Sequence, residues 1–472
     1  MKNSGLVLLL LAALFIAPAA RAQEPKTDWP ALEAEAKAHL LNLLSIKTVY
    51  TDANEADAAR YIYSALNRDR IEWDIYKPSE KRASLVAYIR GESRDNPLYL
   101  VSHLDTVDAD FSEWESLPFL PEEKDGYIYG RGAADNKDMA AISMAVLAAL
   151  KRGGVKLRRD VVMLALADEE GGGSGGVKYL LSAHPDVIRK GYAIYSGGGV
   201  VRDAGGAATM LIVSAADKQY MDVRVLARGA SGHAAAPPSD NAIYTLATAL
   251  RKIKTFSPSA RLNPVTRGFF RSIYKSQGQD ARATLDMLLG GDEHAFQQAA
   301  NVMSGDPFFL SQLKDTVAPT VLYAGNLPNV VPAEAQVVLN CRLLPDTDPV
   351  RFLDSLKEHI DMDNVLVLPV EMPVFPGPEM RPSDDELFSA ISSAASSRMP
   401  GAAIAGGLMP GATDAGALRR VGVTAYGVPG GSAYGEENRT HGPNERVELA
   451  DFYRRLRFVY EITLKYASSQ GQ

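Results

Sequence analysis

Cysteine is almost absent from this sequence. Cys341 is the single cysteine among 472 residues, so neither an intramolecular disulfide nor a thiolate metal cluster can form. It lies within VVLNCRLLP, an apolar run that is typical of a strand. We therefore expect Cys341 to be buried rather than reactive.

Long runs of one charge sign are also missing. The 50 Lys and Arg residues are mixed with 57 Asp and Glu residues, for a net charge of -7. Nucleic acid and anionic membranes are bound by concentrated basic charge, which this sequence does not have. We therefore expect no nucleic-acid partner.

Beyond the N-terminus, no apolar segment approaches the ~20 residues that a membrane-spanning helix needs. The N-terminal apolar stretch, residues 6–16, is itself short, and it lies between Lys2 and a small-residue cleavage site at residues 20–22. We predict a signal peptide over residues 1–22 and an exported protein, periplasmic or secreted, with no membrane association after cleavage at Gln23. A single membrane anchor is the alternative.

Helix and strand patterns alternate through the first part of the chain. Residues 29–66 have apolar side chains at helical spacing. The following segments predict strand, strand, helix, strand and helix, at residues 83–89, 97–103, 139–151, 160–167 and 175–183. Such alternation builds a parallel sheet covered by helices, so the fold class is α/β.

The pattern changes in the middle of the chain. A strand, a helix, two strands and a helix are predicted at residues 220–227, 241–256, 317–324, 333–343 and 349–360. This smaller α+β unit carries a polar, helical insertion at about residues 257–314. We predict a catalytic domain in two parts, residues 23–217 and 373–472, interrupted by a smaller domain over residues 218–372.

The first candidate for chemistry is SHLDTVD, where an apolar strand ends in His103 and Asp105. Residues two apart on a strand point to the same side, so the two side chains can interact. A carboxylate that accepts the second imidazole N–H orients the ring as a metal ligand. Strand ends in open α/β sheets are also where ligands bind. A surface histidine followed by a turn aspartate is the alternative.

Asp135 lies in the glycine-rich turn GRGAADNKD, just before the helix predicted at residues 139–151. Glycines let the backbone approach a site closely, and a carboxylate there can bridge two cations with its two oxygens. Taken alone, the turn favours a simpler interpretation, in which Asp135 or Asn136 caps the helix.

Glu169 and Glu170 follow a buried strand in ADEEGGGSGG, and His441 lies in the loop THGPNERVEL. Adjacent carboxylates repel unless cations or protons offset their charge. One glutamate can bind a metal while its neighbour acts as general base on a metal-bound water. A solvated acidic turn and a surface histidine are the separate alternatives. The joint order His-x-Asp, Asp, Glu-Glu, His favours a metal-dependent site.

That ordered set resembles the di-zinc metallopeptidase family of aminoacylase, glutamate carboxypeptidase, carboxypeptidase S and succinyl-diaminopimelate desuccinylase. The motifs SHLDTV, GRGAADNK, ADEEGG, GASGHAAAPP, NVVPAEA and THGPNERV occur in the family's order, over nearly the whole mature chain. The carboxypeptidase S branch is the most similar. The resemblance implies a phosphorylase/hydrolase-like catalytic domain with a mixed, mainly parallel sheet. It also implies a smaller ferredoxin-like domain that serves as a lid or in dimerisation.

Position by position, the resemblance implies two zinc ions per chain. Asp135 would bridge them, with His103 on one ion and Glu170 and His441 on the other. Glu169 becomes the general base.

The resemblance assigns further roles away from the metals. Asp105 orients the histidine two residues before it. His233 matches a histidine that crosses a homodimer interface into the partner's active site. Asn329 and Arg342 match substrate-binding residues, and the planar fork of Arg342 suits a terminal carboxylate. Without the family, His233 is a packing histidine of a surface loop and Arg342 is solvated.

One position departs from the family pattern. The most similar branch has Leu-Asp-Glu-Gly-Gly after the next strand, and its Asp is the remaining ligand of the first metal. This chain has AIYSGGGVV, which puts Tyr195 at that position. A tyrosine hydroxyl, with an ordinary pKa of about 10, is a poor zinc ligand at neutral pH. We therefore expect the His103 site to be weak, so one metal per chain is the alternative to two.

These residues predict hydrolysis of a peptide or amide bond next to a free carboxylate, as in a dipeptidase or carboxypeptidase. Deacylation of N-acyl amino acids uses the same residues and stays open, so the substrate is a small peptide or an N-acyl amino acid. A binding protein that lost catalysis at Tyr195 is an alternative of another class. The retained Asp135, Glu169, Glu170 and His441 favour an enzyme.

Overall fold

The computed structural model describes residues 27–203, 205–274, 277–378, 380, 383–429 and 439–469. The signal peptide predicted at residues 1–22 lies outside the described residues and stays a prediction. None of the described helices combines the length and apolar character needed to cross a membrane.

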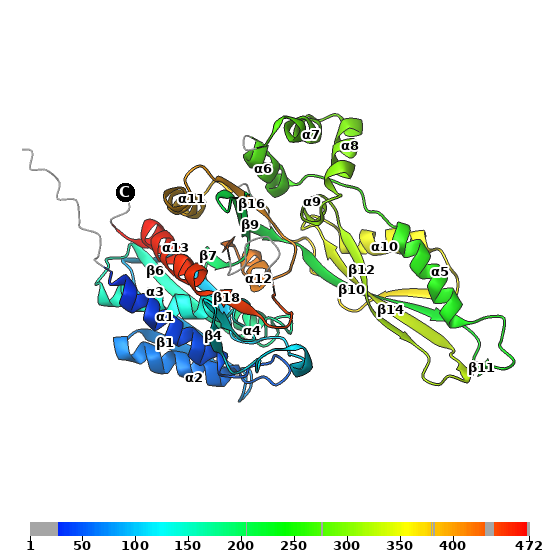
Figure 1. Cartoon of the computed structure of the whole chain (residues 1–472), viewed down its shortest axis with the longest axis horizontal. Coiled ribbons are helices and arrows are strands. Elements are labelled where there is room, and N and C mark those ends of the chain that lie inside the picture. The colour runs from blue at the N-terminus through cyan, green and yellow to red at the C-terminus, as the bar shows by residue number, and fades with distance from the viewer. Residues whose placement is uncertain are drawn as a thin grey trace, which may run out of the picture.

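A mixed sheet forms the centre of the catalytic domain (Figure 1). Its strands are β1 Glu72–Tyr76, β2 Ser84–Ile89, β3 Ser93–His103, β6 Arg159–Leu166, β7 Gly191–Ser196, β8 Gly199–Arg202, β9 Ala208–Asp217, β16 Ala403–Met409 and β17 Val423–Val428. The order is β1-β2-β6-β3-β7-β17-β9-β16, with β8 beside β9. The central strands β6, β3, β7 and β17 are parallel, whereas β1, β2 and β8 pair antiparallel. The predicted mixed, mainly parallel sheet is thus confirmed.

Helices cover both faces of this sheet because its strands are apolar on both sides. Leu98 and Leu100 of β3 pack toward one helical layer, and Tyr99 and Val101 toward the other. The first layer contains α1 Trp29–Leu44, α2 Glu55–Leu66, α3 Lys137–Arg152, α11 Glu386–Arg398 and α13 Leu449–Ala467. The second contains α4 Val177–Ala183 and α12 Asp414–Arg420. A three-stranded sheet of β4 Glu122–Lys124, β5 Tyr127–Tyr129 and β18 Arg446–Glu448 and the turns η1 Asn67–Asp69 and η2 Phe111–Glu113 complete the domain.

The smaller domain has the predicted ferredoxin-like β-α-β-β-α-β order. Its main elements are β10 Gln219–Arg228, α5 Ala242–Thr255, β12 Thr316–Ala324, β14 Glu334–Leu343, α10 Pro349–Ile360 and β15 Val365–Pro369. The antiparallel sheet has the order β12-β14-β10-β15. Both helices pack on one face, where Met221, Val223 and Cys341 are buried. The expected burial of Cys341 is confirmed, and the other face of the sheet is left without a helix.

The helical insertion packs against the catalytic domain and not, as predicted, against the smaller domain. It comprises α6 Pro264–Ile273, α7 Gln279–Leu289, α8 Glu293–Met303 and α9 Pro307–Leu313. We expected it to belong to the smaller domain, yet Phe269 and Phe270 of α6 are buried against Ile212 of β9 and Ala405 of β16, in the catalytic sheet. The amphipathic pattern of α6 specifies an apolar face but not the partner of that face.

Candidate metal centre

Four segments of the catalytic domain converge on one place. β3 ends at His103, the turn before α3 carries Asp135, the loop after β6 carries Glu169 and Glu170, and His441 lies just before β18. Because β3 and β6 are neighbouring parallel strands, their C-terminal ends meet at the same edge of the sheet. The residues predicted from the sequence to hold metal are therefore brought together.

Asp135 lies between two histidines. Its Oδ1 is 3.1 Å from His103 Nε2, and its Oδ2 is 3.3 Å from His441 Nε2. Its two oxygens face two directions, as a carboxylate must in order to bridge two cations. Asn136, not Asp135, occupies the N-cap position of α3, and it forms no side-chain capping bond. Helix capping is thus not the role that the structure gives Asp135.

Two sets of donor atoms, which share Glu170, lie at this place. His103, Glu169 and Glu170 form one set, and Asp135, Glu170 and His441 form the other, each with its ligand atoms within 4.8 Å of one another. Glu170 Oε1 lies 3.1 Å from His441 Nε2. Imidazole nitrogens combined with carboxylate oxygens are the donors that zinc and similar divalent metals bind.

The charges at this place also fit a cation. Hydrogen bonds to Asp135 and Glu170 raise the pKa of His441 to about 10. Burial lowers the pKa of His103. The hydrogen bonds to Asp105 and Asp135, together with nearby negative charges, outweigh this effect, so the pKa is raised overall. The carboxylates thus stabilise positive charge on both histidines. A divalent cation would supply that charge and displace the protons.

Asp105 does more than the sequence predicted. The nearer acceptor for His103 Nδ1 is the backbone carbonyl of Asp105 at 3.0 Å, whereas its carboxylate Oδ1 is 3.5 Å away. The buried carboxylate accepts the backbone N–H groups of Glu169 at 3.1 Å and of Glu170 at 2.9 Å. Asp105 therefore positions the Glu-Glu pair as well as the histidine.

Glu169 has the surroundings of a proton acceptor. Burial raises its pKa well above the usual range; His103 opposes this effect, whereas the charges of Asp414 and Asp135 add to it. A base with a raised pKa takes and returns protons near neutral pH more effectively than an ordinary carboxylate. Asp414, the first residue of α12, is itself buried near this site and was not singled out from the sequence.

Glu445 is a second residue that the sequence did not single out. Its buried carboxylate accepts the backbone N–H groups of Gly132 at 3.1 Å, Ala134 at 2.8 Å and Asp135 at 3.1 Å, and it pairs with Arg131 Nη1 at 2.7 Å. The loop that follows His441 thereby fixes the turn that presents Asp135. A glutamate in a polar loop gives no such signal in the sequence.

A buried ion-pair layer supports the Glu-Glu loop. Arg82 pairs with Asp168, which precedes Glu169 and accepts the backbone N–H of Gly175 at 2.7 Å. Glu55 lies behind Arg82, with Oε1 3.7 Å from its Nε. Both Glu55 oxygens are buried without a hydrogen-bond partner among the described residues, and burial raises the pKa of Glu55 to about 7.

Glu55→Gln is expected to stabilise the fold in a pH-dependent way. The folded protein holds this proton up to about pH 7, whereas the unfolded chain releases it near 4.5. The stabilising effect of protonation is complete below pH 4.5 and is lost as pH rises through 7. The variant should therefore gain on the order of 3 kcal/mol over the wild type at pH 8 and almost nothing at pH 4.

Denaturant unfolding of both proteins across this pH range measures the difference, with the exposed Glu80→Gln as the matched control. A difference that does not change with pH would contradict the assignment.

Tyr195 is turned toward another cluster. Its hydroxyl donates to Asp217 Oδ1 at 2.9 Å and accepts from Arg419 Nη2 at 3.1 Å, and Thr413 Oγ1 also donates to Asp217, at 2.7 Å. Burial raises the pKa of Tyr195, which keeps its hydroxyl protonated. The next residue, Ser196, accepts from Arg455 Nη2 at 3.1 Å. The position where the family has a metal-binding Asp is thus occupied by side chains with other partners.

His233 and Asn329 lie together, but away from the other site residues. β11 Gly232–His233 pairs with β13 Val330–Val331, and the N–H of Ala234 donates to the carbonyl of Asn329 at 3.0 Å. Figure 1 shows β11 at the far end of the smaller domain, remote from α3 and β18. Within one chain these two residues do not meet the metal ligands.

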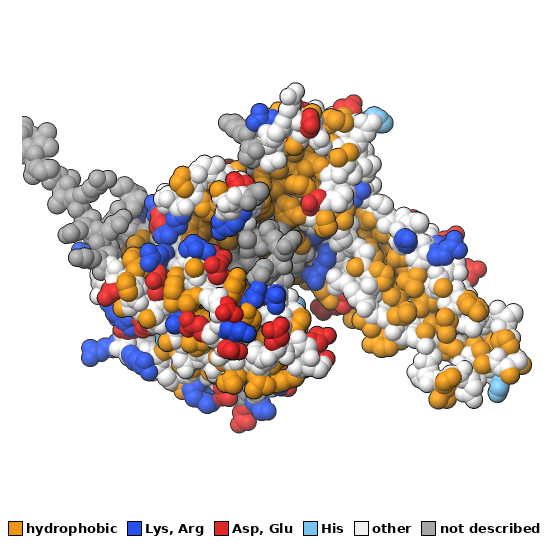
Figure 2. All heavy atoms as spheres, in the orientation of Figure 1, with side chains coloured by type: hydrophobic (Ala, Val, Ile, Leu, Met, Phe, Trp, Pro, Cys, Tyr) orange, Lys and Arg blue, Asp and Glu red, His pale blue; other side chains and the backbone are white. Residues whose placement is uncertain are grey.

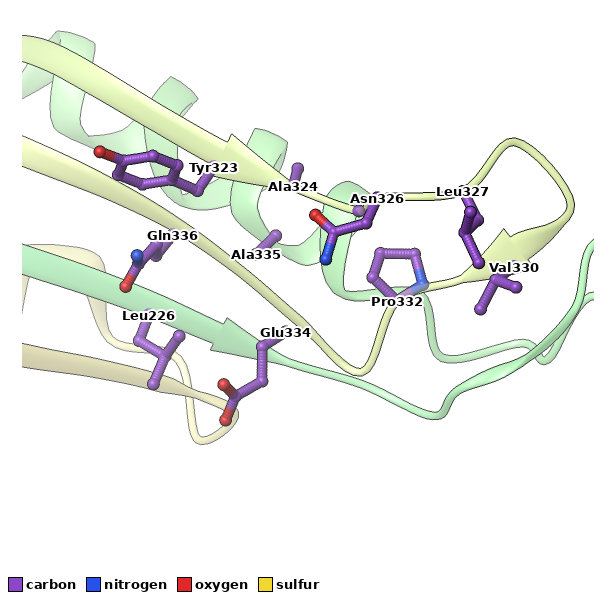
Figure 3. A pocket seen from close by; sticks show the side chains of 11 residues that line it. Leu226, Tyr323, Ala324, Asn326, Leu327, Val330, Pro332, Glu334, Ala335 and Gln336 are labelled. Carbon is purple, nitrogen blue, oxygen red and sulfur yellow. The ribbon is translucent and has the colours of Figure 1, made fainter.

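A groove of about 390 Å³ lies at the same end of the smaller domain (Figure 3). Leu226, Tyr323, Leu327, Val330 and Pro332 supply its apolar lining, with polar contributions from Asn326, Glu334 and Gln336. It contains none of the predicted metal ligands. The concave surface of this domain is thus separate from the histidine and carboxylate cluster, although it adjoins the strand that pairs with His233.

Arg342 occupies the open face of the smaller sheet. Burial lowers its pKa, and the negative charges of Asp222 and Glu169 oppose this effect. Glu169 therefore contributes to the electrostatic environment of Arg342 within one chain.

The mixed sheet, the paired histidine and carboxylate sets and the half-buried Glu169 define a metal-dependent hydrolase. The chain belongs to peptidase family M20/M25/M40, whose model matches residues 99–465.

Relatives and solved structures agree with this assignment. The chain is 23% identical to probable carboxypeptidase S-like 2 of Dictyostelium discoideum, over 78% of this chain and 71% of that protein. It is 24% identical to the N-fatty-acyl-amino acid synthase/hydrolase PM20D1 of Mus musculus, over 77% and 73%. The crystal structure of an M20 family metallo-carboxypeptidase from Sulfolobus solfataricus matches with a TM-score of 0.65 at 19% identity, covering 92% of this chain and 99% of that one. The expected family and fold are confirmed, and the alternative of a non-catalytic binding protein is not supported.

Proposed function

We propose that this enzyme hydrolyses a peptide or amide bond next to a free carboxylate. One observation carries the proposal: Glu169 lies with His103 and Glu170 in one set of donor atoms, and this set shares Glu170 with the set of Asp135 and His441. A base thus lies beside metal ligands, and we propose that the cationic fork of Arg342 completes the site. They match the three needs of such a substrate: proton transfer, activation of the amide and recognition of its carboxylate.

The protein's own groups divide the work as follows. Glu169 takes a proton from the attacking water and delivers it to the leaving amine nitrogen. Asp105 holds the backbone of Glu169 in place during both transfers. Arg342 binds the free carboxylate and so fixes which amide bond faces the base.

We propose zinc as the metal, held by His103, Asp135, Glu170 and His441, with Glu169 left free of the metal to act as the base. When bound, it supplies Lewis acidity that activates water and polarises the amide carbonyl. In this proposal Glu169 is kept as the base, and Tyr195 has other partners, so the His103 position has fewer carboxylate ligands than the second position. We therefore propose that this position binds metal more weakly. Metal analysis tests the proposal, since two tightly held ions per chain would contradict it.

A substrate panel tests the reaction itself. Purified enzyme is given Ala-Leu, N-lauroyl-leucine and the carboxamide of each, and release of leucine or leucinamide is measured. We expect hydrolysis of at least one carboxylate substrate and little of its amide. Hydrolysis of none of the four would contradict the proposal.

N-acyl amino acid deacylation is the second candidate. A specific observation favours it: the relative from Mus musculus is named an N-fatty-acyl-amino acid synthase/hydrolase. The same base, metal ligands and Arg342 serve both reactions. The panel separates them by the substrate that is cleaved faster, Ala-Leu or N-lauroyl-leucine.

We further propose that the enzyme is a homodimer joined through its smaller domains. β12 is an edge strand that exposes Val321, Leu322 and Tyr323 by 39%, 60% and 58%. Figure 2 shows hydrophobic side chains spread over the visible face of this domain, whereas charged side chains are frequent on the catalytic domain. Long apolar edges pair with another chain unless they are covered.

His233→Ala is expected to lower turnover by about a hundredfold while metal content stays unchanged, because we propose that this histidine polarises the amide carbonyl in the partner's site. Mixing the His233→Ala and Glu169→Gln variants under subunit exchange should restore activity. In mixed dimers, one site combines an intact Glu169 with the partner's intact His233. No recovery in verified mixed dimers, or loss of metal from His233→Ala, would contradict this role.

We also propose export of the enzyme, based on the N-terminal sequence. Cell fractionation, combined with N-terminal sequencing of the mature protein, tests both the compartment and cleavage before Gln23.

A further inference from the structure

The open face of the smaller sheet carries a connected set of side chains around Arg342. The antiparallel register of β10 and β14 places Tyr220 opposite Arg342 and Asp222 opposite Asn340. Alternate residues of these strands point to the other face, where Met221 is fully buried. The four side chains therefore form two neighbouring cross-strand pairs on one face.

Hydrogen bonds connect these four residues in series. Asp222 accepts from the Tyr220 hydroxyl at 2.7 Å through Oδ2, and from Asn340 Nδ2 at 2.9 Å through Oδ1. Asn340 Oδ1 in turn accepts from Arg342 Nε at 2.9 Å. The Tyr220 ring lies beneath the guanidinium, 4.5 Å from its centre to Cζ. Arg342 is thus held from its Nε edge and from one face.

Asn340 separates the negative charge of Asp222 from the positive charge of Arg342. Its amide can satisfy both neighbours in one orientation only, with NH2 toward the carboxylate and oxygen toward the guanidinium. A carboxylate at position 340 would instead pair directly with Arg342. The neutral spacer therefore orients the guanidinium without cancelling its charge.

The outer edge of the Arg342 fork is left for another anion. Among the described residues, no carboxylate forms an ion pair with Arg342, whereas the buried Arg131, Arg419 and Arg455 pair with Glu445, Asp217 and Asp138. The two Nη groups are the donors that bind a carboxylate in bidentate fashion. Their fixed orientation lowers the entropy that is lost on binding such a ligand.

We propose that Tyr220, Asp222 and Asn340 are positioning residues that keep Arg342 oriented and uncompensated, and so make the enzyme select substrates with a free carboxylate. This inference rests on the proposed function. It adds the residues that set the carboxylate preference, and these are distinct from the metal ligands and from Glu169.

Exchanging two residues gives the sharpest test. The double variant Asp222→Asn, Asn340→Asp keeps composition, net charge and a complete hydrogen-bond series, but it moves the carboxylate onto Arg342 Nε. The KM for the cleaved carboxylate substrate, Ala-Leu or N-lauroyl-leucine, should rise at least about tenfold with kcat less affected. Cleavage of the matching carboxamide should stay within about threefold of the wild-type rate. The ratio of kcat/KM for the acid to kcat/KM for the amide, called the preference ratio here, should therefore fall.

Two single variants test the same inference if the double variant does not fold. Tyr220→Leu removes the ring beneath the guanidinium and should also lower the preference ratio. Tyr220→Phe keeps the ring and should retain most of it. Thermal unfolding and metal content are measured for each variant, because a purely structural defect would reduce cleavage of acid and amide alike.

The outcomes separate this inference from the proposed function. A lower ratio with unchanged metal content supports the positioning role. An unchanged ratio, or an equal loss on both substrates, overturns it while the hydrolase proposal stands. A wild-type enzyme that cleaves neither substrate refutes the proposed function, and the positioning role is refuted with it.

Discussion

Glu169→Gln should reduce turnover by about 10² to 10⁴-fold with metal still bound. The amide keeps the size of the carboxylate and leaves the backbone bond to Asp105 intact. It cannot take the proton from water or return one to the leaving amine. KM should change little, because Arg342 and the metal ligands are untouched. Steady-state kinetics and metal analysis on the same preparation measure the effect.

The neighbouring glutamate is the matched control. Glu170 contributes to both donor sets, so Glu170→Gln should lower metal content as well as turnover. The two adjacent substitutions are therefore expected to differ in metal content. Near-wild-type turnover by Glu169→Gln with metal bound would show that another group is the base.

Asp135→Asn should remove metal from both positions. Its two oxygens face His103 and His441, so one substitution removes the proposed bridge between both metal positions. An amide supplies one neutral oxygen where two charged ones are needed. Loss of an outer partner typically costs 10 to 100-fold in metal affinity, so loss of this ligand should cost more than about a hundredfold. Activity should fall with metal content.

Asp138→Asn provides the control for this variant. Asp138 is fully buried, and it pairs with Arg455. Its substitution should lower the thermal unfolding temperature, because an unpaired buried arginine remains, but metal should be retained. Full metal content in Asp135→Asn, measured by elemental analysis after dialysis, would contradict a bridging role.

The sequence predicted the residues at strand ends best. His103 and Glu169 follow apolar strands, and neighbouring parallel strands end at the same edge of a sheet. Asp135 and His441 lie in loops, where the turn of Asp135 taken alone favoured helix capping and a surface role was the alternative for His441. Only the order of all the motifs predicted that they belong to one site.

The contacts that the sequence did not predict depend on packing between distant segments. Glu445 holds the turn of Asp135 more than three hundred residues earlier, through backbone N–H groups that have no side-chain signature. The insertion has an amphipathic α6, but the sequence does not specify that Phe269 meets the catalytic sheet. Tyr195 marked a departure from the family, whereas its partners Asp217 and Arg419 follow only from the fold.

The hydrogen bonds between Glu445 and the Asp135 turn have a consequence for biosynthesis. The ribosome makes Asp135 long before Glu445 and His441, and the whole smaller domain is translated between them. Until the last part of the chain emerges, the Asp135 turn lacks its anchor and the second donor set lacks its histidine. Metal loading of the second donor set must therefore follow completion of the catalytic domain. Truncation before His441 should yield a chain that has most of its sheet strands and lacks the second donor set.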